Sequence, residues 1–284
     1  MTYSELMTTG VTMLTDAGFE EARTDVRVLL LSVCGVDFMT LLRDGALQVP
    51  EEKKERFFAA LAKRKKHVPV QYITGEQEFC GLKFYVGPEV LIPRPETELL
   101  AEAVFRESAG KRILDMCTGS GCIAVTAAKL GTPSFVAASD YSAEALSVAR
   151  KNAELHDVKI TFFQGDLFET VEGVYDIIVS NPPYIRSEVI ETLMPEVREH
   201  EPRLALDGTK DGVYFYRRIV AEAKAHLVPG GRLLFEIGHD QAKEVTGLLS
   251  KEGYTEIEVR KDYAGLDRMV FAVWPVQNKE KEDV

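Results

Sequence analysis

The chain has few cysteines, a single tryptophan and no long hydrophobic run. The four cysteines, Cys34, Cys80, Cys117 and Cys122, form no CxxC pair, which is typical of reduced thiols in a cytosolic protein and not of a disulfide framework. No apolar stretch is long enough to cross a bilayer, and the N-terminus has no signal-peptide pattern. We therefore expect a cytoplasmic protein without a membrane anchor.

Metal ligands and a broad cationic surface are also lacking. The five histidines show no metal-ligand spacing, so we expect no metal site. The formal net charge of -11 argues against tight nonspecific binding to a polyanion, and we expect no direct binding of nucleic acid. The one dense cationic run, 63–66, is interpreted as a solvated helix face, with docking as the minor alternative.

Composition and patterning predict one large domain and one smaller domain. The length of 284 residues, with 45% hydrophobic and 28% charged residues, is ordinary for a globular protein that buries a full core. Residues 1–70 carry apolar side chains at helical spacing and predict a small helical domain. Residues 71–93 predict a β-hairpin linker, 94–276 the larger α/β domain, and 277–284, rich in Lys and Glu, a disordered tail.

Strands and helices alternate from about residue 110 onward. This rhythm predicts a doubly wound, mostly parallel Rossmann-like sheet with helices on both faces and a C-terminal antiparallel hairpin. Pro95 stands in the first turn of a helix that precedes the sheet. The predicted strands are 112–115, 134–139, 160–164, 174–180, 232–237, 257–261 and 268–273, and the predicted helices are 122–130, 143–155, 214–227 and 241–252.

The tetrapeptide Asn181-Pro182-Pro183-Tyr184 directly follows a predicted buried strand. Its Asn side-chain oxygen and a Pro carbonyl can accept the two hydrogens of a planar NH2 group, and the Tyr ring can cover that group. A rigid exit turn after the strand explains the tetrapeptide alone equally well. The rest of the chain has to decide between the two interpretations.

A Gly-rich loop follows the first predicted strand of the sheet. Its glycines let the backbone approach a ligand closely. The acid at the strand end would repel a pyrophosphate but attract a sulfonium and an ammonium group, which favours S-adenosylmethionine over NAD. The candidate cofactor-binding residues of this loop are Asp115, Cys117, Thr118, Gly119, Ser120 and Gly121.

Two further acids and Asn181 follow the next three strands. Asp140, about 19 residues after Gly121, stands where an acid binds ribose hydroxyls. Asp166 can accept from an adenine amino group, with Leu167 against the ring. Each acid alone would be a helix N-cap or a surface carboxylate. Together with Asp115 and Asn181, in register with the strands, they predict one crevice at the carboxyl edge of the sheet.

The chain resembles a class I methyltransferase, and more closely the release-factor glutamine N5-methyltransferase family. The resemblance covers nearly the whole chain, including Pro69–Glu76, Leu91–Glu98, the Gly-rich loop, the NPPY tetrapeptide and Asp262–Arg268. It implies transfer of a methyl group from S-adenosylmethionine, leaving S-adenosylhomocysteine, to the amide nitrogen of the glutamine in the Gly-Gly-Gln loop of class 1 peptide release factors. The partner would be the release factor, and we expect a monomeric enzyme.

The chain departs from this family's pattern at two positions. Cys117 stands where the family's loop has its first glycine, and Leu167 stands where the family often has an aromatic residue. Because cysteine carries a Cβ, we expect that position 117 does not need a conformation open only to glycine. A buried, unreactive thiol is the favoured interpretation, and a redox-sensitive thiol beside the cofactor is the alternative.

The resemblance also suggests roles at the acceptor side. Asn181 and the Pro182 carbonyl would accept the two N–H bonds of the glutamine amide, Pro183 would stiffen the turn, and Tyr184 would stack on the amide plane. No general base is needed before transfer, since the N-methylated amidium cation that the transfer forms is strongly acidic and loses its proton afterwards. Arg94 would line the substrate pocket or form a structural ion pair. Glu201-Pro202 and Asp207-Gly208 would belong to a lid or substrate-side loop, with an ordinary surface loop as the alternative.

Three other functions compete with this one. The NPPY tetrapeptide also occurs in enzymes that methylate the N6 of adenine in DNA, but this acidic chain lacks a basic groove. Methylation of a glutamine in a ribosomal protein is the second alternative. The Pro-Glu-Thr-Glu segment, 95–98, disfavours it, because the related ribosomal-protein methyltransferases tend to differ there. A noncatalytic cofactor-binding protein is the third, which the departure at Cys117 keeps open.

Overall fold

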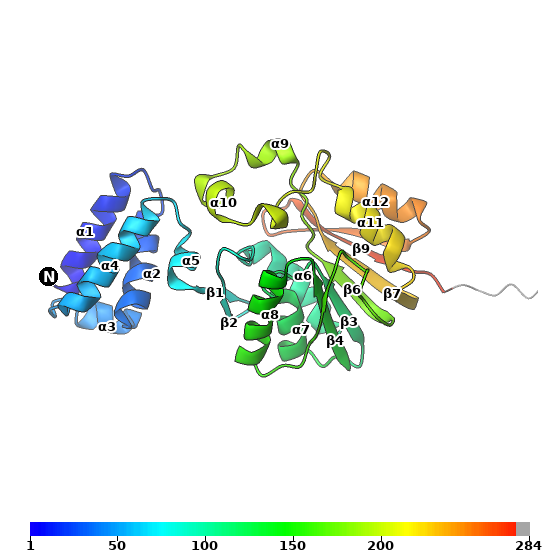
Figure 1. The fold of residues 1–284 in the computed structure, drawn as a ribbon, viewed down its shortest axis with the longest axis horizontal. Helices are drawn as coiled ribbons and strands as arrows, with labels where there is room; N and C mark the ends of the chain where they lie inside the picture. The colour runs from blue at the N-terminus through cyan, green and yellow to red at the C-terminus, as the bar shows by residue number, and fades with distance from the viewer. Residues whose placement is uncertain (277–284) are drawn as a thin grey trace, which may run out of the picture. The chain divides into compact units, whose positions relative to one another are not determined.

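The computed structural model describes residues 1–276, and the expected disordered tail lies outside the described residues. The described chain divides into two compact units (Figure 1). The first holds Met1–Glu76 together with Met194–His200, and the second holds Gln77–Leu193 and the chain from Glu201 onward. The inclusion of 194–200 in the first unit had no counterpart in the sequence interpretation, because a contact so far along the chain leaves no local pattern.

The first unit is helical, as predicted. Its core is built from apolar side chains that recur on one face of each long helix, among them Leu6, Leu14, Leu30 and Phe57. A capping box begins the first helix, since Thr2 accepts from the Glu5 N–H while the Glu5 side chain accepts from the Thr2 N–H. The helices are α1 (Tyr3–Thr15), α2 (Ala22–Cys34), α3 (Phe38–Arg43), α4 (Glu51–Arg64), α5 (Val70–Thr74) and α10 (Pro195–His200).

The cationic run 63–66 is not a uniformly solvated face. Arg64 is only 8% exposed, and its guanidinium lies 4.1 Å from the centroid of the Phe19 ring. It pairs with Asp25 at 2.7 Å and with Glu196 at 2.8 Å. The interpretation of the run as surface charge is therefore wrong at this position, because two carboxylates and an aromatic face offset the loss of water around the guanidinium.

The predicted hairpin linker is shorter than expected. Strands β1 (Glu76–Phe79) and β2 (Leu82–Tyr85) pair through a turn in which Cys80 and Gly81 both have positive φ, at 50° and 71°. The flanking residues predicted as part of the hairpin form helix α5 on one side and an irregular segment, 86–92, on the other.

The seven-stranded sheet confirms the doubly wound architecture. Its strand order is β5-β4-β3-β6-β7-β9-β8. The first five strands in this order are parallel, and β9 is antiparallel to both of its neighbours. The strand order reverses between β3 and β6, and a crevice at the carboxyl ends is expected there. The strands are β3 (Arg112–Met116), β4 (Phe135–Asp140), β5 (Thr161–Gln164), β6 (Tyr175–Ser180), β7 (Leu227–Glu236), β8 (Thr255–Lys261) and β9 (Asp267–Val273).

Helices cover both faces of this sheet (Figure 1). Successive strand residues point to opposite faces, so Ile178 of β6 packs with α11 and α12, while Ile177 and Val179 pack with α6 and α7. The helices of the second unit are α6 (Pro95–Arg106), α7 (Cys122–Leu130), α8 (Ala143–Leu155), α9 (Ser187–Ile190), α11 (Tyr214–Ala223) and α12 (Ala242–Lys251), with a 3₁₀ turn η1 (Arg203–Ala205).

The largest error in the predicted elements concerns β7. The helix predicted over 214–227 ends at Ala223, and the strand predicted from 232 begins at Leu227. Residues 228–231, which include Pro229-Gly230-Gly231, lie between the predicted helix and the predicted strand as their connection. In the structure this segment is a bulge within the strand, because Tyr175 pairs with Leu227 while Ile177 pairs with Arg232.

Two helix-interior glycines should respond oppositely to alanine. At Gly10 of α1 a Cβ would lie 2.8 Å from the Val26 Cγ1 atom, so Gly10→Ala should lose about 1–3 kcal/mol of unfolding free energy. At Gly247 of α12 a Cβ meets nothing within 4 Å, so Gly247→Ala should gain up to about 1 kcal/mol. Urea unfolding of both variants checks the pair, and equal shifts of the two would contradict the described packing.

Candidate active site

A cavity of about 340 Å³ opens at the carboxyl edge of the parallel strands. It is lined by the loops that follow β3, β4, β5 and β6, with α11 and the segments 89–97 and 202–205 completing the wall. The predicted site residues that line it are Arg94, Cys117, Thr118, Gly119, Ser120, Asp140, Asp166, Leu167, Asn181 and Pro183. Asp115, Gly121, Pro182 and Tyr184 do not line it.

Asp115 supports the Gly-rich loop from within the protein. Its carboxylate is fully buried, and Oδ2 accepts from the Thr118 hydroxyl at 2.6 Å and the Ala124 N–H at 3.1 Å. Burial raises the pKa of Asp115 to about 7, against the lowering effect of these two hydrogen bonds. The structure therefore gives Asp115 a part in shaping the loop, and a direct contact with a cofactor remains a prediction.

Asp140 connects the loops after β3 and β4. Its carboxylate accepts from the Gly119 N–H at 2.8 Å and from the Ser142 N–H at 2.9 Å. Gly121 has a φ of 80°, and a Cβ there would lie 3.1 Å from the Ala149 Cβ, so the loop can pack on α8 only because this residue is glycine. The Asp140 carboxylate keeps lone pairs for hydroxyl donors in the cavity.

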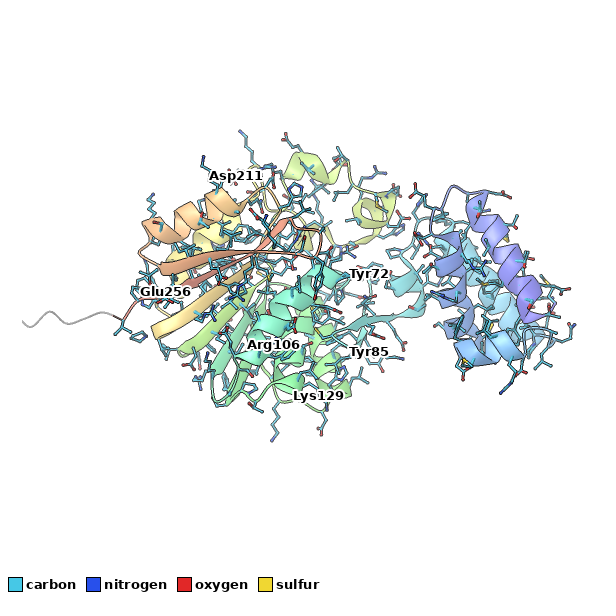
Figure 2. All side chains as sticks on the ribbon, turned by 180° about the vertical axis from the view of Figure 1, so that it is seen from behind. Tyr72, Tyr85, Arg106, Lys129, Asp211 and Glu256 are labelled. Carbon is cyan, nitrogen blue, oxygen red and sulfur yellow. The ribbon has the colours of Figure 1, made fainter. Side chains whose placement is uncertain are left out.

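A buried asparagine fastens this loop to the hairpin. Asn152 of α8 donates to the Ser120 carbonyl at 2.8 Å and exchanges two hydrogen bonds with the Tyr85 backbone. Figure 2 labels Tyr85 at the end of β2. The hairpin thereby supports the wall of the cavity through Asn152.

Asp166 forms an ion pair across the cavity wall. Both of its carboxylate oxygens accept from the Arg218 Nη1 atom of α11, at 2.8 and 2.9 Å. The neighbouring Leu167 is buried and has a φ of 53°, a conformation that a bulky residue adopts only under constraint. Asp166 therefore offers its remaining lone pairs, and Leu167 an apolar surface, to any base that enters.

The side chain of Asn181 is held in one orientation by its amide nitrogen. Nδ2 donates to the Thr97 Oγ1 atom at 3.3 Å, and the Thr97 hydroxyl donates to Glu236 Oε2 at 2.6 Å. The Tyr184 hydroxyl donates to the other oxygen of Glu236 at 3.3 Å. Burial raises the pKa of Tyr184 well above its ordinary value, and the adjacent Glu236 carboxylate adds to the effect.

The main chain of the NPPY turn is held by close neighbours. The Tyr184 carbonyl accepts from the buried Gln241 side chain at 2.9 Å. A Cβ at Gly208 would lie 2.7 Å from the Tyr184 Cα, and a Cβ at Gly212 would lie 2.6 Å from the Tyr184 carbonyl oxygen. Larger residues at these two positions would displace the turn, so the loop between η1 and α11 can press on it only through glycine.

Arg94 both lines the cavity and forms an ion pair. Its Nη2 atom donates to the buried Glu201 carboxylate, whose other oxygen accepts from the Ile92 N–H at 3.4 Å. The residues that follow Glu201 contribute Pro202 and Leu204 to the cavity wall. The predicted lid segment thus lies at the cavity, and the predicted ion pair of Arg94 is present.

The donor set suits S-adenosylmethionine better than a dinucleotide. Asp140 offers a carboxylate to hydroxyl groups, and Leu167 and Phe215 offer apolar surface to a base. The two arginines of the described lining, Arg94 and Arg218, are each paired with a carboxylate. Neither is left free for a pyrophosphate, whereas a sulfonium needs no cation.

Comparisons with known proteins assign the chain to a family. Residues 5–75 match the family model described as PrmC N-terminal domain, and residues 95–200 match the methyltransferase small domain. The release factor glutamine methyltransferase of Geobacter sulfurreducens is 43% identical over 259 residues, covering 90% of this chain and 91% of the relative. The chain belongs to the release factor glutamine methyltransferase family.

Other relatives agree with this assignment. The family member from Cereibacter sphaeroides is 41% identical and covers 97% of this chain and 99% of its own length. A crystal structure of a methyltransferase from Pyrococcus furiosus superposes with a TM-score of 0.55 at 20% identity, covering 80% of this chain and 100% of that chain, and shows the shared fold. Within residues 1–276, no helix has the length and apolarity to span a membrane, and no cluster of potential ligands could hold a metal ion.

Position 117 is not open only to glycine, as expected, but its conformation still favours glycine. Its φ is 60°, so this position of the family's loop does adopt the left-handed conformation that favours glycine. A residue with a Cβ can enter that region at a cost of about 1–2 kcal/mol. Burial, together with the nearby Asp140, raises the pKa of the Cys117 thiol far above its ordinary value, which disfavours the reactive thiolate.

Several residues of the site were missed by the sequence interpretation. Glu236 lies one residue before the end of the predicted strand 232–237 and ends β7 at the same edge as Asp140, so the pattern of acids at strand ends indicates it as well. Thr97 lies within Leu91–Glu98, a segment that carries the family resemblance, but no role was predicted for its side chain. Arg218 and Asn152 lie on helices and Gln241 directly precedes one, and no local sequence pattern indicates their partners far along the chain.

The conformation of Cys117 can be tested by comparing two small replacements. Cys117→Gly should be more stable than Cys117→Ala by about 1 kcal/mol, because both remove the thiol and only glycine avoids the left-handed strain. Urea unfolding of the two purified variants measures the difference. The reverse order, which an ordinary loop conformation would produce, would show that the φ at this position is negative in solution.

Proposed function

We propose that this protein transfers a methyl group from S-adenosylmethionine to the N5 amide nitrogen of the glutamine in the Gly-Gly-Gln motif of class 1 peptide release factors. The observation that carries the proposal is the orientation of Asn181. Its NH2 group is committed to Thr97, so its Oδ1 atom is the one left to accept a hydrogen bond. An acceptor at this position suits a ligand that brings an NH2 group.

The residues of the turn would act by holding and polarising a weak nucleophile. The amide nitrogen of glutamine has a delocalised lone pair, so orientation and electrostatics carry the catalysis. Asn181 Oδ1 and the Pro182 carbonyl would accept its two N–H bonds and stabilise the positive charge that grows on the nitrogen. Pro183 would keep the turn rigid, and the Tyr184 ring would cover the amide and exclude water. Arg94, on the same wall, remains a candidate substrate contact.

The Gly-rich loop and the two acids would hold S-adenosylmethionine, which supplies an electrophilic methyl group when bound. Asp140 would accept from the ribose hydroxyls, and Asp166 would accept from the adenine amino group with Leu167 against the ring. Cys117, Thr118, Gly119 and Ser120 line the same cavity. Asp115 and Gly121 would support this loop from behind.

Asn181→Ala and Asp140→Ala should separate the two halves of the site. Asn181→Ala should lower kcat by about 10²-fold or more while cofactor affinity is kept, because it removes an acceptor used in the transition state. Asp140→Ala should raise the cofactor Kd roughly 10- to 100-fold, because hydrogen bonds to a carboxylate are lost. Single-turnover transfer and calorimetry with S-adenosylhomocysteine measure the two effects.

Glu154→Ala provides the matched control for these variants. Glu154 is exposed on α8, outside the cavity, so both kcat and cofactor Kd should stay at the wild-type values. Full transfer activity in Asn181→Ala would refute the role of the turn, and unchanged affinity in Asp140→Ala would remove that residue from the cofactor site.

One labelling experiment distinguishes the proposed substrate from the alternative substrates. The protein is mixed with labelled S-adenosylmethionine and, separately, with a purified class 1 release factor, ribosomal proteins and DNA, and the methylated residue is mapped by mass spectrometry. The acidic net charge of -11 disfavours DNA as the target. Label in a ribosomal protein or in DNA, and none in the release factor, would replace the proposed substrate.

The helical unit, residues 1–70 of the predicted division, is proposed as the domain that recognises the body of the release factor. Helix α3 exposes Met39 at 69% and Leu42 at 64%, with Phe38 beside them at 45%. Exposed apolar side chains grouped on one short helix are typical of a protein contact. A protein substrate would use this contact, and a short peptide carrying the Gln loop would not.

Leu42→Ser should therefore raise the KM for an intact release factor about tenfold while the KM for a short Gly-Gly-Gln peptide stays unchanged. Leu130→Ser, which replaces a 44% exposed leucine at the end of α7 in the other unit, is the control and should change neither. An equal rise in both KM values for Leu42→Ser would reject the docking role.

A cytoplasmic location and a monomeric state belong to the same proposal. Peptide release factors act in translation, so the enzyme would meet them in the cytoplasm, and no further partner is required for the site.

A further inference from the structure

A buried carboxylate lies behind the acceptor side of the cavity. Glu236 ends strand β7, is 2% exposed and does not line the cavity itself. Its two oxygens accept from different residues, Oε2 from Thr97 and Oε1 from Tyr184. Its main-chain carbonyl accepts from the Tyr216 hydroxyl at 2.8 Å, which fixes the end of the strand against α11.

The direction of each hydrogen bond follows from counting protons. A carboxylate can only accept, so the single hydroxyl proton of Thr97 is committed to Glu236 at 2.6 Å. Thr97 Oγ1 can then only accept from Asn181, and the group on Asn181 that donates is Nδ2. The opposite amide orientation would place the Asn181 oxygen against a hydroxyl oxygen that has no proton to give.

The same carboxylate also holds the second polar side chain of the tetrapeptide. The Tyr184 hydroxyl donates to it at 3.3 Å, so the ring that follows the two prolines is tied to the same anchor as Asn181. Glu236 is thus bonded to both ends of the NPPY turn, once directly and once through Thr97.

The groups around Glu236 have opposing effects on the ionisation of its carboxyl group. Arg268 of β9 attracts the carboxylate, and Thr97 and Tyr184 donate to it. Burial and the neighbouring Glu96 of α6 oppose ionisation, and burial is the largest effect, which raises the pKa of Glu236. Arg268 is itself held by Asp262 at 3.1 Å and by the Ile237 carbonyl at 3.3 Å, so this counter-charge has a fixed place.

We propose that Glu236 is a positioning residue for methyl transfer, which acts through Thr97 to present the Asn181 oxygen to the substrate and through the Tyr184 hydroxyl to hold the covering ring. This inference rests on the proposed function, since it names the residues that orient its acceptor. A purely structural alternative is that the Thr97–Glu236 bond only fastens α6 to β7. The two roles differ in what a change of hydrogen-bond polarity does while the shape is kept.

Three substitutions change polarity and shape independently. Thr97→Val keeps the branched shape and removes the hydroxyl, while Thr97→Ser keeps the hydroxyl and removes a methyl group. Glu236→Gln keeps the shape but adds an NH2 group that can donate to Thr97, which frees the threonine proton to turn toward Asn181. Glu102→Gln is the matched control for the loss of a carboxylate, because Glu102 is half-buried on α6 and pairs with Arg106, away from Glu236.

The kinetic result expected is a loss of kcat and not of binding. Thr97→Val and Glu236→Gln should lower kcat at least roughly tenfold, with the S-adenosylhomocysteine Kd within about twofold of wild type, because the acceptor is misoriented only at the substrate side. Thr97→Ser and Glu102→Gln should keep kcat within about threefold of wild type. Circular dichroism and thermal unfolding check that each variant is folded.

A second measurement reads the orientation without turnover. The chain contains only three asparagines, Asn152, Asn181 and Asn278, so selective ¹⁵N-asparagine labelling yields three side-chain amide signals. With S-adenosylhomocysteine bound, the Asn181 amide signals should move in Thr97→Val and Glu236→Gln and stay in place in Thr97→Ser. The Asn152 signals, from a residue bonded to Ser120 and Tyr85, serve as the internal reference.

Each outcome decides the proposal. Lost kcat with moved Asn181 signals in Thr97→Val and Glu236→Gln, and neither in Thr97→Ser, supports it. Unmoved Asn181 signals, or a Thr97→Ser enzyme as impaired as Thr97→Val, overturns it in favour of the structural alternative. If the wild-type protein methylates no glutamine, the proposed function fails, and the Asn181 signals alone still decide whether Glu236 orients this side chain.

Discussion

The carboxyl ends of parallel strands must meet at one edge of a sheet, and the whole site depends on this constraint. Asp140, Asn181 and Glu236 lie far apart in the sequence, yet each stands at or directly after the end of a parallel strand. The strand order reverses between β3 and β6, so the loops on either side diverge and leave a cavity between them. The chemistry of the site is then a matter of which side chains those strand ends carry.

The order of the elements and the location of the cavity could be predicted because they depend on local sequence patterns. Apolar runs, turn residues and helix starts identified the order of the elements, and the polar residues at strand ends identified the cavity. The prediction failed where a distant contact outweighs a local signal. Arg64 looks like surface charge until Asp25 and Glu196 are brought to it, and Pro229-Gly230-Gly231 looks like a connection between a helix and a strand until its partner strand is known.

The second kind of failure concerns what a residue does once its position is known. Asp115 was placed at the right strand end, but only the structure shows that its carboxylate faces the protein and serves the loop. Cys117 was recognised as a departure, but a Cβ in the sequence does not reveal that the backbone accepts it at positive φ. Tyr184 and Thr97 acquire their roles only through Glu236, a link that no periodicity encodes.

The one-way hydrogen-bond chain from Asn181 to Glu236 bears on the distinction between an amide and an acid. The turn presents acceptors, and the nearest buried charge behind it is a carboxylate. A glutamine brings two protons to such a surface, whereas a glutamate of the same shape brings lone pairs and a second negative charge. Sites built to accept from an N–H group discriminate against analogues that lack it by about 10⁴-fold or more. A release factor whose loop glutamine has deamidated to glutamate should accordingly not be methylated, so the modification would mark only release factors with an intact glutamine.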